Sequence, residues 1–211
     1  MARKIKLGFV TALTVVRFPL VLAFFAGAVV YTIRPSVPLF LVTFAMLVTS
    51  AVTDLFDGYF ARKFSVQTTL GAHMDPLMDK FFYLSTLPLL VFVALQNGHT
   101  NHGIFLLVIT ILFLSRDQWV TFLRSIGALH DVSGSAHWSG KVRTALNFPL
   151  ICLIYVVEEC PWQFIPPVCA YVFEVIGLAV NLLSAWIYTY RYWPSLKKAA
   201  ELDKHHQEPH P

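Results

Sequence analysis

Four aspartates lie within 26 residues of one another, flanked by apolar sequence, and make up a third of the twelve acidic residues. Asp54 and Asp57 are three residues apart, so they share one face if their segment is helical. Asp75 and Asp79 are four apart and do the same. Two such helices packed side by side would bring four carboxylates together, and like charges this close stay ionised only beside cations. Oxygen ligands favour Mg²⁺, Mn²⁺ or Ca²⁺, so the sequence predicts a metal site.

Small residues and an arginine accompany the aspartates. Gly58 and Gly71 remove side chains where a nucleotide or phosphate could approach the backbone. Divalent cations beside Arg62 favour a phosphate-bearing substrate, because two metals can stabilise charge during displacement at phosphorus. The alternative is an ion or proton pathway through a transporter, since membrane carboxylates serve there too. That alternative leaves the glycines, Ala61 and the arginine unexplained.

The composition is that of a membrane protein. Hydrophobic residues make up 56% of the chain and charged residues only 13%, against about 25% charged in soluble domains. A carboxylate at the centre of a bilayer costs about 3 kcal/mol, so it usually faces a cavity and has a function. We expect an all-α, polytopic membrane domain over residues 1–195 with six transmembrane helices, followed by a polar cytoplasmic tail over 196–211. The six predicted spans are 9–32, 37–60, 76–96, 103–125, 141–158 and 167–191.

The distribution of basic residues predicts the orientation. Of sixteen Lys and Arg residues, only Arg34 falls in a loop assigned to the far side, so both termini and the aspartates are expected in the cytoplasm. The net charge of +4 suits an anionic membrane surface better than nucleic acid. Arg17 interrupts the first apolar run, which argues against a cleaved signal peptide. Cys160 and Cys169 flank a predicted outer loop and could pair in an oxidising compartment.

The segment from Asp54 to Asp79 fills every fixed position of the pattern Asp-x2-Asp-Gly-x2-Ala-Arg-x8-Gly-x3-Asp-x3-Asp. It closely resembles the signature of the CDP-alcohol phosphotransferases, a family of six-helix membrane enzymes that are usually homodimers. The resemblance implies transfer of a substituted phosphate from a CDP-linked donor to an acceptor hydroxyl, with release of CMP.

The resemblance also implies a role for each matched aspartate. Asp54, Asp57 and Asp75 would bind one Mg²⁺ or Mn²⁺ ion, and Asp54, Asp75 and Asp79 a second. Asp79 would in addition be the general base that deprotonates the acceptor hydroxyl. Asp75 followed by Pro76 is also the pattern of a helix N-cap, a reading that does not exclude metal binding.

The same signature implies contacts to the CDP donor. Gly58, Ala61 and Gly71 would shape the nucleotide pocket, and Arg62 would contact the diphosphate. The alternative for Gly58 and Ala61 is close helix packing, because small residues line helix interfaces in membranes.

Cations on the fourth and fifth predicted spans indicate a second substrate. Arg116 and Arg124 are eight residues apart, and Lys141 and Arg143 open the next span. Facing one cytoplasmic cavity, they would hold an anionic acceptor, most simply a phosphate. In the alternative, Arg116 pairs with Asp117 or with a motif aspartate, and the other three side chains extend to the membrane interface.

The pattern Arg-acidic-x6-Arg and the segment Gly-Lys-Val-Arg-Thr resemble bacterial phosphatidylglycerophosphate synthases. So does Leu13-Thr-Val-Val-Arg17 in the first span. This resemblance implies transfer from CDP-diacylglycerol to glycerol 3-phosphate among the lipids of the bacterial inner membrane, with the active site facing the cytoplasm. Asp117 is also a feature of cardiolipin synthases, and Asn147 stands where a glutamine-type amide is usual. A cardiolipin synthase, or an enzyme acting on inositol phosphate or serine, therefore remains an alternative.

Overall fold

The computed structural model describes residues 2–64, 69–129 and 138–205. Side chains are described for residues 12, 15–53, 63–64, 74, 77–129, 140 and 142–200. Over these ranges the chain is entirely helical apart from short connections, as predicted, and no strand occurs. The six helices are α1 (Ala2–Ile33), α2 (Val37–Lys63), α3 (Thr69–Gln96), α4 (Thr100–Leu129), α5 (Trp138–Glu159) and α6 (Pro167–His205).

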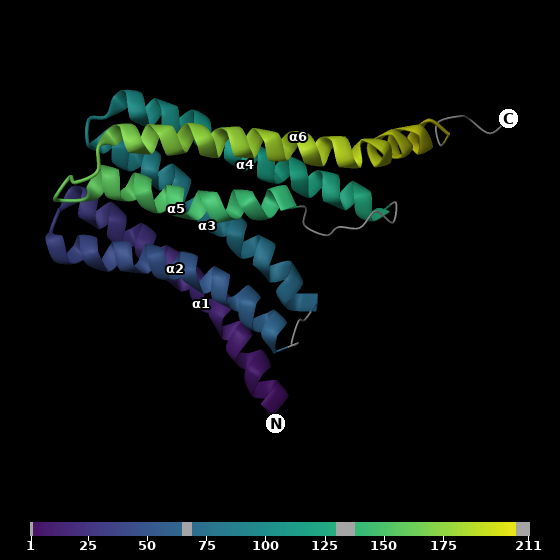
Figure 1. Ribbon diagram of the computed structural model, residues 1–211, viewed down its shortest axis with the longest axis horizontal. Coiled ribbons are helices and arrows are strands. Elements are labelled where there is room, and N and C mark those ends of the chain that lie inside the picture. Colours follow the sequence, from purple (N-terminus) through teal and green to yellow (C-terminus); the bar gives the residue numbers. More distant parts are fainter. Residues whose placement is uncertain (1, 65–68, 130–137, 206–211) are drawn as a thin grey trace.

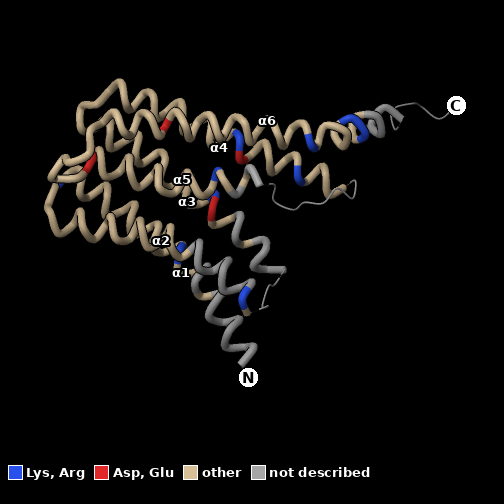
Figure 2. The backbone as a smooth tube through the Cα atoms, in the orientation of Figure 1, with Lys and Arg blue, Asp and Glu red and all other residues tan. Residues whose placement is uncertain are grey.

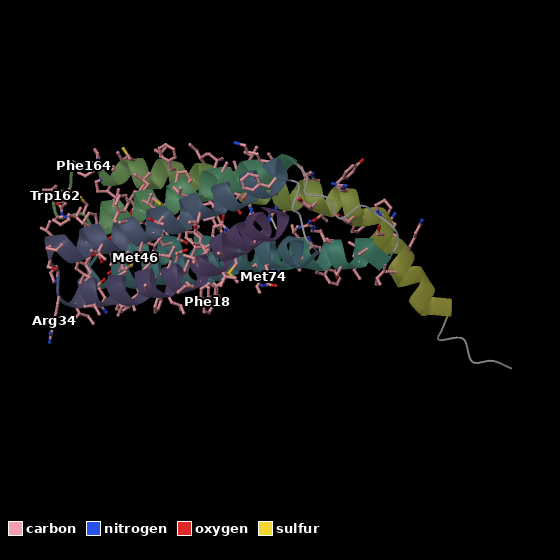
Figure 3. The ribbon with its side chains drawn as sticks, turned by 90° about the horizontal axis from the view of Figure 1, so that it is seen from below. Phe18, Arg34, Met46, Met74, Trp162 and Phe164 are labelled. Atoms are coloured by element: carbon pink, nitrogen blue, oxygen red, sulfur yellow. The ribbon has the colours of Figure 1, made fainter. Side chains whose placement is uncertain are left out.

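The helices form a bundle in which successive helices alternate in direction (Figure 1). The start of α1 and the end of α6 lie toward the same end of the bundle, which we call the motif end because α2 finishes and α3 begins there. The α1–α2, α3–α4 and α5–α6 connections lie at the opposite end, the far end. Figure 3 shows Arg34, Trp162 and Phe164 together at the far end. At the α3–α4 turn, Gly98 adopts a φ of 80°, which a residue with a side chain rarely adopts.

Within the described part of the chain, four helical segments are long and apolar enough to cross a membrane: Val15–Ile33, Leu77–Gln96, Thr100–Leu129 and Pro167–Ala200. In α2 the described apolar stretch, Val37–Thr53, is shorter than a span. Large apolar side chains such as Phe173, Leu183 and Trp186 point outward, at 50% exposure or more, as expected for a lipid-facing surface. The chain is therefore a multi-pass membrane protein.

Two helices, α1 and α4, each pack extensively against two others. Helix α1 packs against both α2 and α3, and α4 packs against both α3 and α6, while α5 packs mainly on α6. Buried aromatic residues join α2 to α5, because Tyr155 on α5 stacks on Phe40 of α2 and shares a 2.7 Å hydrogen bond with Thr43. These contacts join the first turns of α2 to the last turns of α5 at the far end of the bundle.

A network of polar side chains connects the helix ends at the far end of the bundle. His102 at the start of α4 lies between two buried carboxylates, with Nδ1 2.5 Å from Glu158 Oε1 and Nε2 2.8 Å from Glu174 Oε1. His99 Nδ1 contacts Glu158 at 2.9 Å, and Asn97 donates to the Glu158 carbonyl at 2.8 Å. The network thereby joins the far ends of α3, α4, α5 and α6.

Two possibilities that the sequence left open do not hold, and one helix is longer than its predicted span. Helix α3 begins at Thr69, so Asp75 and Pro76 lie inside the helix and Asp75 is not its N-cap. Helix α6 continues through Leu196 to His205, so the predicted tail begins as helix, with Leu196 packed against the buried ring of Tyr192 and its neighbours. All three cysteines are free thiols, so Cys160 and Cys169 are not paired.

Candidate active site

The aspartate motif spans the end of α2 and the start of α3. Asp54 and Asp57 lie in the last turns of α2, and Asp75 and Asp79 in the first turns of α3. Both helices pack on α1 and are joined through residues 65–68, which keeps their motif ends close. Asp79 alone of the four has a described side chain, so the convergence of four carboxylates stays a prediction. The other sequence-predicted residues outside the described side chains are Gly58, Ala61, Arg62, Gly71 and Lys141.

The Asp79 carboxylate faces a buried arginine. Arg17 on α1 is 1% exposed, and its Nη1 lies 3.5 Å from Asp79 Oδ1, whose side chain is 28% exposed. Phe18 stacks on Phe81 beside this pair, with ring centroids 4.5 Å apart. The sequence indicated Arg17 as a charge inside an apolar run but not its partner. In membrane segments such a charge is itself a signal of a functional pair.

Two of the predicted acceptor arginines meet at one carboxylate. Asp117 Oδ1 lies 3.0 Å from Arg116 Nη1 and 2.7 Å from Arg143 Nη1. Arg116 also donates to Ser184 on α6. The pairing of Arg116 with Asp117, stated above as an alternative, is therefore correct. The idea that Arg143 extends to the interface is wrong, because its side chain is only 8% exposed.

Aromatic rings support both guanidinium groups. The Arg143 guanidinium carbon lies 5.3 Å from the ring centroid of Tyr83, and that of Arg116 lies 5.4 Å from the ring of Tyr188. Tyr83 follows Asp79 by four residues on α3, which is about one helical turn. The predicted base and the arginine cluster are therefore neighbours across one turn of α3. Sequence reasoning missed Tyr83, Ser184 and Tyr188, which are neutral and had no charge to mark them.

The arginine cluster retains capacity to bind an anion. Two arginines around one aspartate leave a net charge of +1, and among the described residues the Nε groups of Arg116 and Arg143 have no hydrogen-bond partner. Arg124 is half-buried and lies two turns beyond Arg116, about 12 Å along the α4 axis. The structure thus joins Arg116 with Arg143 and leaves Arg124 outside their contact with Asp117.

The chemistry of the motif fits hard divalent cations, because all four candidate ligands are carboxylates. Among the described side chains, no group of three or more His, Cys, Asp or Glu residues is placed to hold a metal ion. Asp54, Asp57 and Asp75 are not among those side chains. The far-end cluster around His102 is therefore not a competing metal site in the described part of the chain.

Comparison with known proteins agrees with the motif. The family model described as CDP-alcohol phosphatidyltransferase matches residues 9–186. A Bacillus subtilis protein named CDP-diacylglycerol--glycerol-3-phosphate 3-phosphatidyltransferase is 26% identical over 152 residues, 72% of this chain and 74% of the relative. A probable phosphatidylglycerophosphate synthase of Mycobacterium tuberculosis is 31% identical over 120 residues, 57% of this chain.

The match spans about half of the mycobacterial relative, 53% of its length. A cardiolipin synthase (CMP-forming) of Oryza sativa is 28% identical over 122 residues, covering 56% of this chain and 37% of that protein. Because the family model covers most of the helical bundle, including the aspartate motif and the arginine cluster, the chain belongs to the CDP-alcohol phosphatidyltransferase family.

Proposed function

We propose that this enzyme transfers the phosphatidyl group of CDP-diacylglycerol to glycerol 3-phosphate, giving phosphatidylglycerophosphate and CMP. The observation that carries the proposal is the Arg116–Asp117–Arg143 cluster one helical turn from Asp79. A net positive cluster with unpaired N–H donors suits a phosphate-bearing acceptor. The names of the Bacillus and Mycobacterium relatives support the same donor and acceptor.

The reaction assigned to these residues is a displacement at phosphorus. Arg116 and Arg143 hold the phosphate of the acceptor. This directs an alcohol hydroxyl of the same molecule toward Asp79, which accepts the hydroxyl proton. The hydroxyl oxygen then attacks the phosphorus that carries the diacylglycerol. The bond between this phosphorus and the oxygen bridging the two phosphates breaks, and CMP leaves with that oxygen.

Asp54, Asp57, Asp75 and Asp79 are the residues proposed to hold two Mg²⁺ or Mn²⁺ ions. Bound there, divalent cations would neutralise the charge that develops on the donor diphosphate. The contacts to the CDP moiety proposed from the family signature are Gly58, Ala61, Arg62 and Gly71. Lys141, beside Arg143 at the start of α5, and Arg124 are proposed as further acceptor contacts.

The proposed setting is the bacterial inner membrane, with six crossings and both termini in the cytoplasm. Residues 196–205 of the tail continue α6 and would extend into the cytoplasm. The positive charges near the motif end support this orientation, and Figure 2 shows Arg and Lys residues along the motif-end halves of α4 and α6. A homodimer is proposed from the family resemblance.

Cardiolipin synthesis is the second candidate. Asp117 neutralises one of the two arginines, which leaves less positive charge for a phosphate monoester than two unpaired arginines would. The acceptor would then be phosphatidylglycerol, whose phosphate is a diester with a single charge. The similarity to the Oryza sativa cardiolipin synthase favours the same candidate. Inositol phosphate and serine have no specific support among the described residues.

An acceptor panel distinguishes these candidates. Purified protein in lipid nanodiscs is given radiolabelled CDP-diacylglycerol, Mg²⁺ and one acceptor at a time: glycerol 3-phosphate, phosphatidylglycerol, inositol phosphate, serine or glycerol. We expect phosphatidylglycerophosphate to form with glycerol 3-phosphate at a rate well above all other acceptors. Preferential formation of cardiolipin would transfer the assignment to the second candidate.

A further inference from the structure

Arg17 is a charge with no place in the reaction described so far. It lies within the apolar segment Val15–Ile33 and is 1% exposed. A buried guanidinium in a membrane segment is costly unless an opposite charge compensates it. Among the described side chains, its acidic contact is Asp79, at 3.5 Å.

The Arg17–Asp79 pair differs from the other buried arginine pairs. Arg116 and Arg143 contact Asp117, which is 9% exposed and lies outside the aspartate motif. Asp79 belongs to the motif and is 28% exposed, so one side of its carboxylate stays accessible while the other faces Arg17. Arg17 therefore touches the proposed base from the side of the helix interface.

The position of Arg17 is fixed by packing. Helix α1 packs against α2 and α3, the two helices that carry the motif. The stacked rings of Phe18 and Phe81 lie directly beside the pair, one from α1 and one from α3. Arg17 is therefore buried at the interface of α1 with the motif helices, where a guanidinium can orient the carboxylate it contacts.

We propose that Arg17 is a positioning residue for the transfer reaction, which orients Asp79 and offsets one of the four negative charges of the motif. This inference rests on the proposed metal-dependent function. It assigns Arg17 two opposite effects on the enzyme. The positive charge weakens cation binding at the motif, and the contact holds the Asp79 carboxylate in the orientation needed for proton transfer.

The two effects predict opposite changes in one variant. Arg17→Gln removes a unit positive charge close to the motif, and Coulomb attraction then favours a divalent cation by about tenfold even with water-like screening. The same substitution lets Asp79 reorient, and misplacing a catalytic group by about 1 Å costs about 100-fold in turnover. A general loss of structure would lower both the metal affinity and the turnover rate. Tighter metal binding together with slower turnover therefore distinguishes the proposed role from unfolding.

The test is a titration of Mn²⁺ followed by electron paramagnetic resonance, which counts free Mn²⁺ without any turnover. The parent protein, Arg17→Gln, Arg17→Lys and Arg34→Gln are compared in lipid nanodiscs, and kcat is measured in parallel. Arg34 is the matched control because it is an exposed arginine beyond the other end of α1. Arg34→Gln should resemble the parent in both measurements.

We expect Arg17→Gln to bind Mn²⁺ about tenfold more tightly than the parent and to lose about 100-fold in kcat. Arg17→Lys keeps the charge but not the planar guanidinium, so its Mn²⁺ affinity should stay within about twofold of the parent while kcat falls. Unchanged or weaker Mn²⁺ binding in a folded Arg17→Gln protein overturns the inference. If that variant does not fold, a parental kcat in Arg17→Lys overturns it instead. A parent protein that binds no Mn²⁺ overturns the proposed metal site itself, and the inference with it.

Discussion

Each deeply buried arginine among the described residues has an aspartate as its partner, and the two aspartates involved serve different parts of the site. Asp117 joins Arg116 to Arg143, whereas Asp79 faces Arg17. A carboxylate between two guanidinium groups holds both in fixed positions and lowers their mutual repulsion. Asp117 is therefore best understood as the support that keeps two arginines together for an anionic ligand.

The first residue-scale prediction concerns the motif. Asp54→Ala, Asp57→Ala, Asp75→Ala and Asp79→Asn should each reduce activity by orders of magnitude, because each removes a proposed metal ligand and Asp79→Asn also removes the base. CMP release from CDP-diacylglycerol measures the loss, and membrane insertion of each variant serves as the control. CMP release at the parental rate in Asp79→Asn, or in excess chelator, would contradict the proposed chemistry.

The second residue-scale prediction concerns the residues proposed to bind the acceptor. Arg143→Ala and Lys141→Ala should raise the KM for glycerol 3-phosphate by about 10- to 150-fold, the range for loss of one charge-assisted hydrogen bond. The KM for CDP-diacylglycerol should change little. Arg124→Ala is a useful comparison, since Arg124 lies two turns from Arg116 and should have a smaller effect. Variants that fail mainly in donor binding would show that these cations do not contact the acceptor.

At the scale of the helices, the far-end network explains how α4, α5 and α6 are held together away from the site. His102 contacts Glu158 on α5 and Glu174 on α6, and Glu174 is fully buried. A neutral imidazole donates only one hydrogen bond, so two such contacts require an additional proton on the imidazole or on a carboxyl group. The three side chains therefore act as one unit that holds three helix ends.

His102→Leu should destabilise the protein by about 3–5 kcal/mol, because it leaves Glu174 buried without its histidine. For a chain of this size the apparent Tm should fall by about 6–20 °C in detergent, followed by circular dichroism. His99→Leu is the matched control: its side chain is 56% exposed and contacts the same Glu158, so its loss should cost less than about 1 kcal/mol. Activity per folded molecule should persist in both. An unchanged Tm in His102→Leu would show that the contacts do not hold the helices.

At the scale of the whole molecule, the two ends of the bundle differ in charge. The connections at the far end carry Arg34 alone among the Lys and Arg residues, whereas Arg124, Arg191 and Lys197 lie in the last parts of α4 and α6, toward the motif end. Because basic residues favour the cytoplasmic side, this asymmetry supports the proposed orientation, in which the site would meet water-soluble acceptors and CMP. The acyl chains of the donor would remain among the outward apolar side chains of the bundle.

Single cysteines introduced into a protein without its three native cysteines test this orientation. In intact cells, Arg34→Cys and Asn101→Cys should react with a membrane-impermeant thiol reagent, while Lys63→Cys and Lys198→Cys should be protected until the cells are opened. All four positions are exposed at the protein surface, so protection reports the membrane and not burial in the fold. Labelling of Lys63→Cys from outside would reverse the proposed orientation.

The sequence predicted the helices and the family well, and the side-chain partners poorly. Apolar length and Pro or Gly breakers are local signals, so all six helices were located, with ends displaced by up to a few turns at α1, α3 and α6. The convergence of Arg116 with Arg143 followed from charge and membrane depth. The contact of Arg17 with Asp79 depends on how α1 crosses α3, which no local pattern encodes. The tyrosines beneath the arginines were missed for the same reason.

The most direct test of the central claim is a product balance with the purified protein, CDP-diacylglycerol and ³²P-labelled glycerol 3-phosphate in nanodiscs. Transfer to this acceptor predicts that label enters the lipid phase in a 1:1 ratio with CMP released. Both products should disappear together on removal of divalent metal and in Asp79→Asn. Label that stays in the aqueous phase while CMP is released, or CMP that appears only when phosphatidylglycerol is added, would contradict the claim.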